Sequence, residues 1–241
     1  MGQALVTGAT SGIGRAIAIA LKGAGHEVVA VGRRGEALAA LEREHGIAGR
    51  RADLADRKAA RAALAGLAPD ILVNNAGVMP PLAHFCDTDE DEIDRAVTVN
   101  LSSVLFLTRL VAPGMRARGR GHIFFTGSTA GHAAFAHYAV YCATKAAIGG
   151  FAQALRLDMA PAGVRVTEIV AGRVETGLYK GLLGEEARAA MYAGNSAVQP
   201  EDVAAMVLAV HGLPASVDVA RFDILPTHQA TATGGAGKKG D

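Results

Sequence analysis

Tyr141 and Lys145 are the residues whose types and spacing most directly suggest acid–base chemistry. Residues four positions apart lie on the same face of a helix, and this pair stands at an Ala-rich segment with helical periodicity. A free tyrosine phenol has a pKa of about 10, which is too high for easy proton exchange near neutrality. A neighbouring ammonium group favours the phenolate, so we expect Lys145 to lower the pKa of Tyr141. The pair is a candidate acid and base for a substrate oxygen.

Ser128 is a candidate partner for this pair, thirteen residues before Tyr141. It follows the apolar segment HIFFT (122–126), which we predict to be a strand. Ligands of open α/β sheets bind at the carboxyl ends of the strands, where the Ser128 hydroxyl could hold a substrate oxygen against Tyr141. Asn100 lies in a helical stretch although Asn is a mediocre helix former. It is either a site residue or a tolerated polar one.

The loop TGATSGIG (7–14) follows a short predicted strand and opens a predicted helix. In this arrangement, backbone N–H groups and the helix N-terminus can bind a pyrophosphate. Gly8 would permit the tight turn, while Gly12 and Gly14 would allow close approach of backbone, phosphate and strand. The alternative is a glycine turn with no ligand.

Arg33 and Arg34 follow Gly32 at the end of the second predicted strand. A site for NAD(H) usually has an acidic residue here, which accepts a hydrogen bond from the ribose 2′-hydroxyl. No carboxylate is present at this point, and a guanidinium group can bind a 2′-phosphate. The pattern favours NADP(H) over NAD(H). Two surface arginines without a ligand are the alternative.

Short β-branched segments alternate with Ala- and Leu-rich helical segments along the whole chain. The predicted strands are 4–7, 27–31, 70–74, 122–126, 164–170 and 221–225. The predicted helices are 14–25, 36–46, 56–67, 99–115, 144–160 and 200–213. This order predicts an α/β fold, a single-domain, Rossmann-like, doubly wound parallel sheet with helices on both faces. We expect the domain to span 1–229 and residues 230–241, rich in Gly, Ala, Thr and Lys, to form a flexible tail.

Composition argues against several classes of partner. A formal net charge of +1 gives no reason to expect nucleic acid or an anionic membrane. No uninterrupted apolar run approaches the roughly 20 residues that span a bilayer, and the first residues do not resemble a secretory signal. We therefore expect a cytoplasmic protein.

Cysteines and carboxylates give no metal pattern. Cys86 and Cys142 are far apart and lack a CxxC spacing, so we expect free thiols. The acidic run DTDEDEID (87–94) could suggest a metal site, but we favour carboxylates at a helix N-terminus. No metal is predicted.

The glycine spacing TGxxxGxG and the later motifs NNAG (74–77) and YCATK (141–145) resemble the short-chain dehydrogenase/reductase family over residues 3–229. The resemblance implies a catalytic tetrad of Asn100, Ser128, Tyr141 and Lys145. It implies hydride transfer between nicotinamide and a carbonyl or secondary alcohol, with Tyr141 as general acid/base. Lys145 would also donate to ribose hydroxyls, and Asn100 would serve a water-mediated proton path to Lys145.

The same resemblance, with the loops discussed above, predicts a set of cofactor-binding residues. Asp53 would lie near the adenine ring, and Thr176 would contact the carboxamide. The full predicted set is Gly8, Thr10, Ser11, Gly12, Ile13, Gly14, Arg33, Arg34, Asp53, Leu54, Asn75, Ala76, Gly77, Tyr141, Lys145, Val174 and Thr176.

Residues 171–196 would form a substrate lid in such a protein. The family usually has Pro-Gly where this chain has Ala171-Gly172, which removes a rigid φ from the hinge. The family is commonly tetrameric, so we expect a homotetramer or homodimer in which helices 99–115 and 144–160 pair.

The segments GSTAG (127–131), RVTEI (165–169), QPEDVA (199–204) and ILPTHQ (224–229) are similar to one branch of the family. This branch includes NADP-dependent 3-hydroxy acid (serine-type) dehydrogenases and related ketone reductases. A 3-hydroxy acid or a small ketone is the expected substrate, and Arg173 or Lys180 could bind a carboxylate or be solvated. An epimerase or dehydratase, or a non-catalytic NADP-sensing module, are the alternatives.

Three further residues stand beside the predicted site. Tyr138 is expected to line the pocket or to pack, because the family spacing selects Tyr141. His132 and His137 could contact substrate or be ordinary loop histidines.

Overall fold

The computed structural model describes residues 2–194 and 196–228 and contains a seven-stranded sheet in the order β3-β2-β1-β4-β5-β6-β7. Every neighbouring pair of strands is parallel. The strands are β1 (Gln3–Thr7), β2 (Glu27–Gly32), β3 (Ala48–Arg51), β4 (Ile71–Asn74), β5 (Gly121–Thr126), β6 (Val164–Ala171) and β7 (Arg221–Ile224). The doubly wound parallel sheet predicted from the sequence is confirmed. The predicted tail, 230–241, lies outside the described residues.

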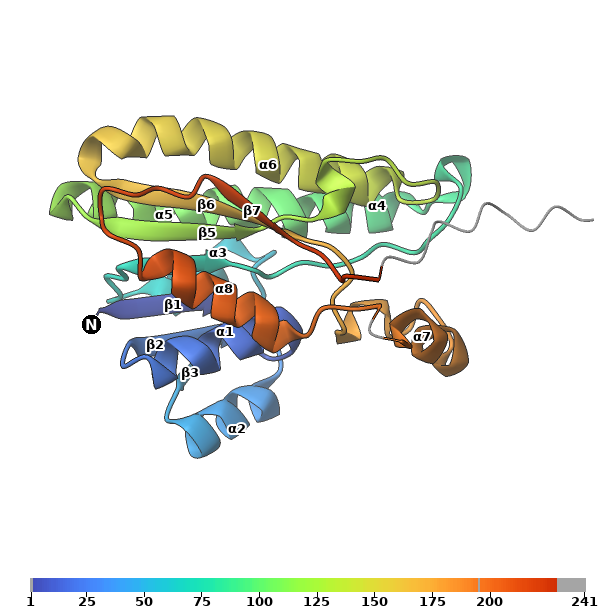
Figure 1. The fold of residues 1–241 in the computed structure, drawn as a ribbon, viewed down its shortest axis with the longest axis horizontal. Coiled ribbons are helices and arrows are strands. Elements are labelled where there is room, and N and C mark those ends of the chain that lie inside the picture. The colour runs from blue at the N-terminus through green and yellow to red at the C-terminus, as the bar shows by residue number, and fades with distance from the viewer. Residues whose placement is uncertain (1, 195, 229–241) are drawn as a thin grey trace, which may run out of the picture.

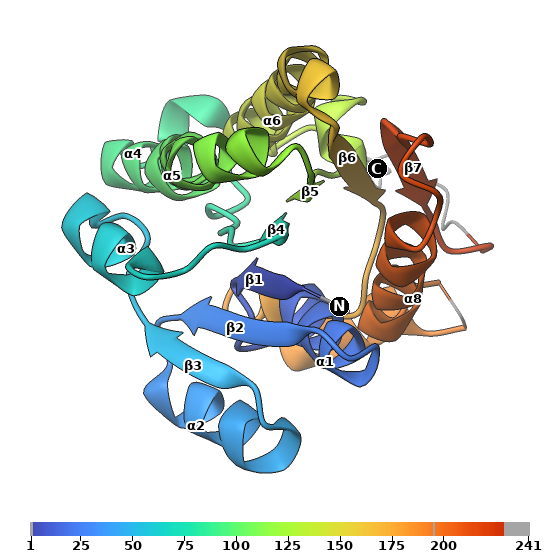
Figure 2. The same cartoon turned by 90° about the vertical axis from the view of Figure 1, so that its left-hand side faces the viewer.

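Helices cover both faces of this sheet (Figures 1 and 2). One face packs on α1 (Gly12–Gly23), α2 (Gly35–His45) and α8 (Pro200–His211). The other packs on α3 (Arg57–Leu64), α5 (Ser103–Arg118) and α6 (Ala139–Met159). A short helix, α7 (Glu185–Tyr192), lies beyond the end of the sheet (Figure 1).

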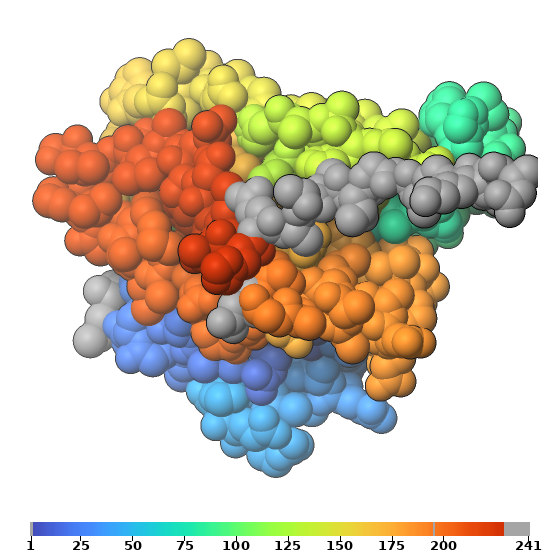
Figure 3. Space-filling model, turned by 45° about the vertical axis from the view of Figure 1, so that its right-hand side comes forward, coloured from blue at the N-terminus to red at the C-terminus, as the bar shows by residue number. Residues whose placement is uncertain are grey.

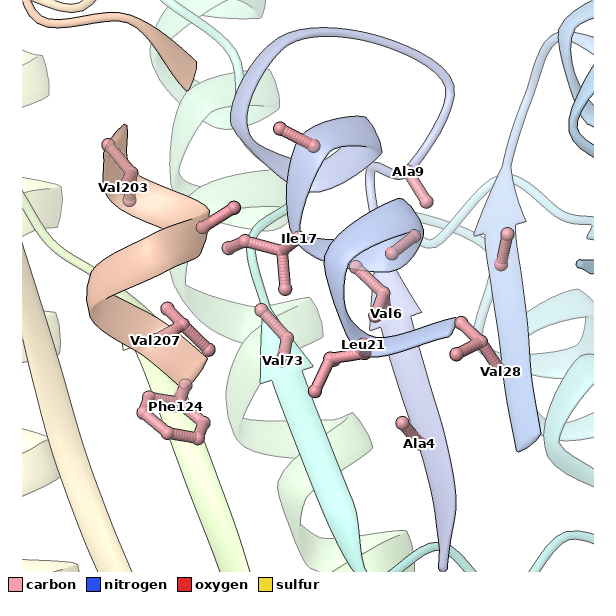
Figure 4. Close-up of a cluster of buried hydrophobic side chains, with 14 of the residues drawn as sticks. Ala4, Val6, Ala9, Ile17, Leu21, Val28, Val73, Phe124, Val203 and Val207 are labelled. Atoms are coloured by element: carbon pink, nitrogen blue, oxygen red, sulfur yellow. The ribbon is translucent and has the colours of Figure 1, made fainter. Parts of the chain in front are cut away.

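The strands are apolar on both faces because each face is covered. On the α1/α8 side, Ile17 and Leu21 of α1 pack towards Val203 and Val207 of α8 and towards Phe124 of β5 (Figure 4). All five side chains are fully buried. Burying each contributes roughly 1.5–3 kcal/mol, and this contact fixes the start of α1 against the sheet.

The structure differs from the sequence prediction in several elements, among them helix α7, which was not predicted as a helix. β3 was not predicted, because AGRR is short, polar and largely exposed, and it becomes a strand through its pairing with β2. The predicted helix 144–160 begins five residues earlier, at Ala139, so that Tyr141 lies inside it.

A continuous helical segment runs from Glu90 to Arg118, through α4 (Glu90–Val97), a π-helical turn η2 (Thr98–Ser102) and α5. Among the described residues it alone is long and apolar enough to cross a membrane, with a mean hydropathy of 1.4 over 18 residues. Its buried residues, such as Leu107 and Met115, belong to the core on this face of the sheet. Packing in the core therefore accounts for the apolar character of these buried residues.

The acidic run lies at the N-terminus of α4, as predicted. The Asp89 carboxylate caps the helix by accepting from the Asp91 N–H at 2.8 Å, and acidic residues fill the first turn. The described part of the chain contains no cluster of His, Cys, Asp and Glu that could hold a metal ion. Cys86 and Cys142 are free thiols.

His122 is buried at the amino end of β5, away from the glycine loop. Its Nε2 lies 2.9 Å from Thr167 Oγ1, and its Nδ1 lies 3.3 Å from Nδ1 of His211. Burial lowers the pKa of His122 to about 2 and that of His211 to about 4. Both rings are therefore neutral in the folded protein near pH 7.

We predict that this pair makes the fold acid-sensitive. The unfolded histidines bind protons below pH ~6.5, whereas His122 in the folded protein does not, so stability falls as pH drops below that value. For His122 the loss is about 3 kcal/mol between pH 7 and pH 4.5. Urea unfolding across this range should show a smaller loss in His122→Gln than in the wild type or in the exposed-site control His228→Gln. Identical pH slopes in all three proteins would contradict the assignment.

Candidate active site

A cleft of about 1250 Å³ lies at the carboxyl ends of the strands. This is the edge where open parallel sheets bind ligands. In Figure 3 the orange surface of the segment around α7 lies beside the blue surface of the N-terminal residues. All but two of the predicted site residues line this cleft: Gly8, Thr10, Ser11, Gly12, Ile13, Arg33, Arg34, Asp53, Leu54, Asn75, Ala76, Gly77, Ser128, Tyr141, Lys145, Val174 and Thr176.

Gly14, one of the two exceptions, has a packing role behind the glycine loop. A Cβ on Gly14 would lie 2.4 Å from Asn75 Nδ2 and 2.6 Å from the Gly8 carbonyl oxygen. Gly8 and Gly12 adopt φ values of +64° and +52°, which favour glycine. The loop can therefore turn tightly between β1 and α1 and leave its backbone facing the cleft.

Thr7, at the end of β1, joins three neighbouring strand ends. Its buried hydroxyl accepts from the N–H groups of Asn75 (3.0 Å) and Ala76 (3.1 Å) and donates to the Val73 carbonyl. Asn75 in turn donates to the Thr7 carbonyl and accepts from the Thr126 hydroxyl of β5, each at 3.2 Å. Thr7 and Thr126 were not among the predicted site residues, because single threonines at strand ends carry no distinctive spacing.

Arg33 and Arg34 lie at the end of β2 on the cleft wall. The Arg34 guanidinium donates to the Thr10 carbonyl and so ties the glycine loop to this wall. Gly32 permits the close approach, since a Cβ there would lie 2.5 Å from Thr10 Cγ2. The Arg33 side chain is exposed and makes no ion pair or hydrogen bond with the described residues.

Tyr141 and Lys145 share the face of α6 that packs against the end of β5, as predicted. Both are buried, at 7% and 6% exposure. The Lys145 Nζ donates to the Thr126 carbonyl at 2.7 Å and lies 5.6 Å from the centre of the Tyr141 ring. Ser128 follows directly after this strand end and lines the same part of the cleft.

Asn100, the second exception, is buried in the π-helical turn η2 behind the cleft. Its amide accepts from the Val78 N–H (2.8 Å) and donates to the Val78 carbonyl (2.9 Å) and to the Thr144 hydroxyl (3.3 Å). It therefore fixes the segment after β4 against α6. A π turn inside an α-helix often marks a functional site, and here it directs this amide inwards.

The segment after β6 closes one side of the cleft. Val174 pairs with Val198, and the Tyr192 hydroxyl donates to the Thr176 carbonyl at 3.3 Å. The Arg173 guanidinium donates to the Met191 carbonyl at 3.3 Å, whereas Lys180 lines the cleft and is exposed. The Arg173 guanidinium therefore already makes a hydrogen bond within this segment.

Of the three further residues named beside the predicted tetrad, only one lines the cleft. Tyr138 lines the cleft, as predicted. His137 is exposed with a φ of +67°, and His132 directs its Nε2 to Glu168. Neither histidine is part of the cleft lining.

Comparison with known proteins identifies the family. The sequence profile described as short chain dehydrogenase matches residues 3–187. The chain belongs to the short-chain dehydrogenase/reductase family. It is an oxidoreductase, as the motifs indicated.

Three relatives show which members of the family this chain is similar to. It is 47% identical to an uncharacterized short-chain type dehydrogenase/reductase of Sinorhizobium fredii, over 97% of this chain and 94% of that protein. It is 37% identical to an NADP-dependent 3-hydroxy acid dehydrogenase of Salmonella typhi, over 95% and 96%. The structure of a closed serine dehydrogenase complexed with NADP⁺ superposes with a TM-score of 0.91, at 35% identity over 97% and 98% of the two chains.

The cleft fits NADP(H), the cofactor of this enzyme. The glycine backbone of the β1–α1 loop provides room for a pyrophosphate at the N-terminus of α1, which favours anions. Arg33 and Arg34 stand where a 2′-phosphate would be expected, and Asp53 follows β3 on the same wall.

Electrostatics at Tyr141 differ from the sequence prediction. Burial raises the pKa of Tyr141 to about 12, although a hydrogen bond with Ser128 acts in the opposite direction. Burial lowers the pKa of Lys145 to about 8, against the effect of the Glu168 carboxylate. The expected lowering of the Tyr141 pKa is not found in the protein alone, because desolvation of the phenolate dominates.

Proposed function

We propose that this enzyme transfers hydride between NADP(H) and a carbonyl or secondary alcohol, with Tyr141 as the general acid and base. The observation that carries the proposal is the burial of Tyr141 and Lys145 on one face of α6, beside Ser128, in the cleft that holds the glycine loop. NADP(H), when bound, supplies or accepts the hydride. The side chains of this chain orient the substrate and move the proton.

Tyr141 donates its phenol proton to the substrate oxygen in the reductive direction, and Ser128 hydrogen-bonds the same oxygen. Tyr141 is protonated near neutrality, as a proton donor requires, because its pKa lies well above 7. Lys145, held by the Thr126 carbonyl, provides the positive charge that favours the phenolate once the proton has left. In our proposal Lys145 also donates to ribose hydroxyls, and Asn100 serves the proton path to Lys145.

The remaining predicted residues hold the cofactor in this proposal. Residues 8 and 10–14 bind the pyrophosphate, Arg33 and Arg34 bind the 2′-phosphate, and Asp53 and Leu54 lie beside the adenine. The strand end at 75–77 flanks the cofactor, while Val174 and Thr176 contact the carboxamide. The common position of these residues along one cleft, apart from Gly14, which packs behind the glycine loop, supports these roles.

A 3-hydroxy acid or a small ketone is the proposed substrate. The names of relatives such as the NADP-dependent 3-hydroxy acid dehydrogenase support this class. Lys180 is the better candidate for a substrate carboxylate, because Arg173 already donates to the Met191 carbonyl. We propose that residues 171–196 act as the lid of a single domain spanning 1–229.

We further propose a cytoplasmic homotetramer or homodimer in which α5 and α6 pair between subunits. Leu105 on α5 is 38% exposed and Leu157 on α6 is 65% exposed. Exposed leucines on both helices support burial of these surfaces in an assembly.

We predict that Tyr141→Phe lowers turnover roughly 10²- to 10⁴-fold, because the proton donor is removed while the ring still packs. The assay follows NADP⁺ reduction with a panel of 3-hydroxy acids and secondary alcohols, and NADPH oxidation with the matching ketones. Tyr138→Phe, which removes a nearby hydroxyl from the same cleft, is the matched control. Full turnover by Tyr141→Phe would contradict the assignment, and product without net cofactor turnover would favour an epimerase or dehydratase.

We predict that Arg33→Ala weakens NADP(H) binding roughly 10- to 100-fold and leaves NAD(H) binding almost unchanged, because one charged hydrogen-bond donor to the 2′-phosphate is lost. Fluorescence titration with NADPH and NADH measures both affinities. Arg43→Ala on α2, which removes an exposed arginine paired with Glu44, is the control. Equal weakening for both cofactors would show that Arg33 does not select the phosphate.

A further inference from the structure

Glu168 of β6 carries a buried carboxylate close to the proposed acid–base residues. Its side chain is 2% exposed. Oε1 lies 3.0 Å from Nε2 of His132, and Oε2 is buried without a hydrogen-bond partner among the described residues. A buried carboxylate is costly unless it is paired or acts on a neighbouring charge. The Lys145 ammonium in the proposed site is such a neighbouring charge.

Two glycines make room for this carboxylate. A Cβ on Gly127, between the strand end and Ser128, would lie 2.4 Å from Glu168 Oε1. A Cβ on Gly149 would lie 3.2 Å from the same atom. Gly149 follows Lys145 by four residues, just as Lys145 follows Tyr141, so the three share one face of α6. The carboxylate thus occupies the space where the next side chain on the Tyr141–Lys145 face would be.

His132 connects Glu168 to the loop that carries Ser128. The Ser128 hydroxyl accepts from the Ala130 N–H at 3.1 Å and caps the short turn η3 (Thr129–Gly131). His132 follows this turn directly, and its side chain is 28% exposed. The His132–Glu168 contact therefore ties the end of the Ser128 loop to β6.

The charged groups around Lys145 are few. Tyr141 comes from its own helix and Glu168 from β6, while β5 contributes the uncharged Thr126 carbonyl. Lys145 and His132 are the titratable groups that face Glu168. Tyr138 and Cys142 are those that face Tyr141. Glu168 raises the pKa of Lys145, against the lowering by burial. It is the only carboxyl group among the groups named here.

We propose that Glu168 and His132 form a pair that positions the turn at 126–128. In this pair, the Glu168 carboxylate supplies the negative charge that keeps Lys145 protonated. This inference rests on the proposed function, in which Lys145 acts as an ammonium group beside Tyr141. Neither residue lines the cleft, so the pair acts through Lys145 and Ser128 and not on the substrate.

The direct test is the ionisation of Lys145 in the protein without cofactor, followed by NMR of ¹³Cε-labelled lysine. Lys145→Arg identifies the resonance by its loss. We expect Glu168→Gln, which keeps the shape and removes the charge, to lower the Lys145 pKa from about 8 by roughly one unit. Asp158→Asn, which removes an exposed carboxylate from the same helix, should leave it unchanged. An unchanged Lys145 pKa in folded Glu168→Gln would overturn the proposal.

Kinetics give a second readout. Activity that needs the ammonium form is lost as pH rises through the Lys145 pKa, so the alkaline limb of kcat should move to lower pH in Glu168→Gln, by the same shift as the NMR titration. A loss of kcat by the same factor at every pH would indicate a purely structural role and overturn the proposal. If Tyr141→Phe retains turnover, the proposed function fails, while the NMR titration still decides the role of Glu168.

The His132 variants keep the proposal testable if Glu168→Gln does not fold. His132→Leu removes the partner of Oε1 and should lower the Lys145 pKa in the same direction, by less. His132→Gln retains an N–H donor and should restore the wild-type titration. Identical Lys145 titrations in wild type and His132→Leu would contradict the role of His132 in the pair.

Discussion

The hydrogen bond from the buried Lys145 ammonium to the Thr126 carbonyl connects the helix that carries the acid–base residues to the sheet edge that carries Ser128. The carbonyl belongs to the last residue of β5, so the position of Lys145 is set by where that strand ends. Removing the ammonium from water lowers its pKa, and the same burial raises the pKa of Tyr141. The contact with Thr126 therefore fixes the position of Lys145, while burial of the pair shifts both pKa values.

The rest of the sheet positions the residues at this edge. Parallel strands bring their carboxyl ends together, and the Thr7 hydroxyl and the Asn75 amide join the ends of β1, β4 and β5 by hydrogen bonds. The glycine loop and the acid–base residues consequently open into one cleft. Asn100, from the π turn, fixes the segment that follows β4 against α6.

Much of this arrangement follows from the sequence. Alternation of apolar strands and amphipathic helices gave the parallel sheet, and the Tyr141–Lys145 spacing gave the shared helix face. β3 could not be predicted, because AGRR becomes a strand only through pairing with β2. The direction of the Tyr141 pKa depends on burial, which spacing does not reveal. Glu168 and His132 are 36 residues apart and meet only because β6 lies beside the Ser128 loop.

The central physical claim is that burial raises the pKa of Tyr141 in the protein without cofactor. NMR of ¹³Cζ-labelled tyrosine, with Tyr141→Phe used to assign the resonance, measures its ionisation in the protein without cofactor. The account predicts that Tyr141 remains protonated up to about pH 11, above the ordinary phenol pKa of about 10. Ionisation of Tyr141 at or below pH 10 would contradict it and would mean that interactions favouring the phenolate outweigh burial.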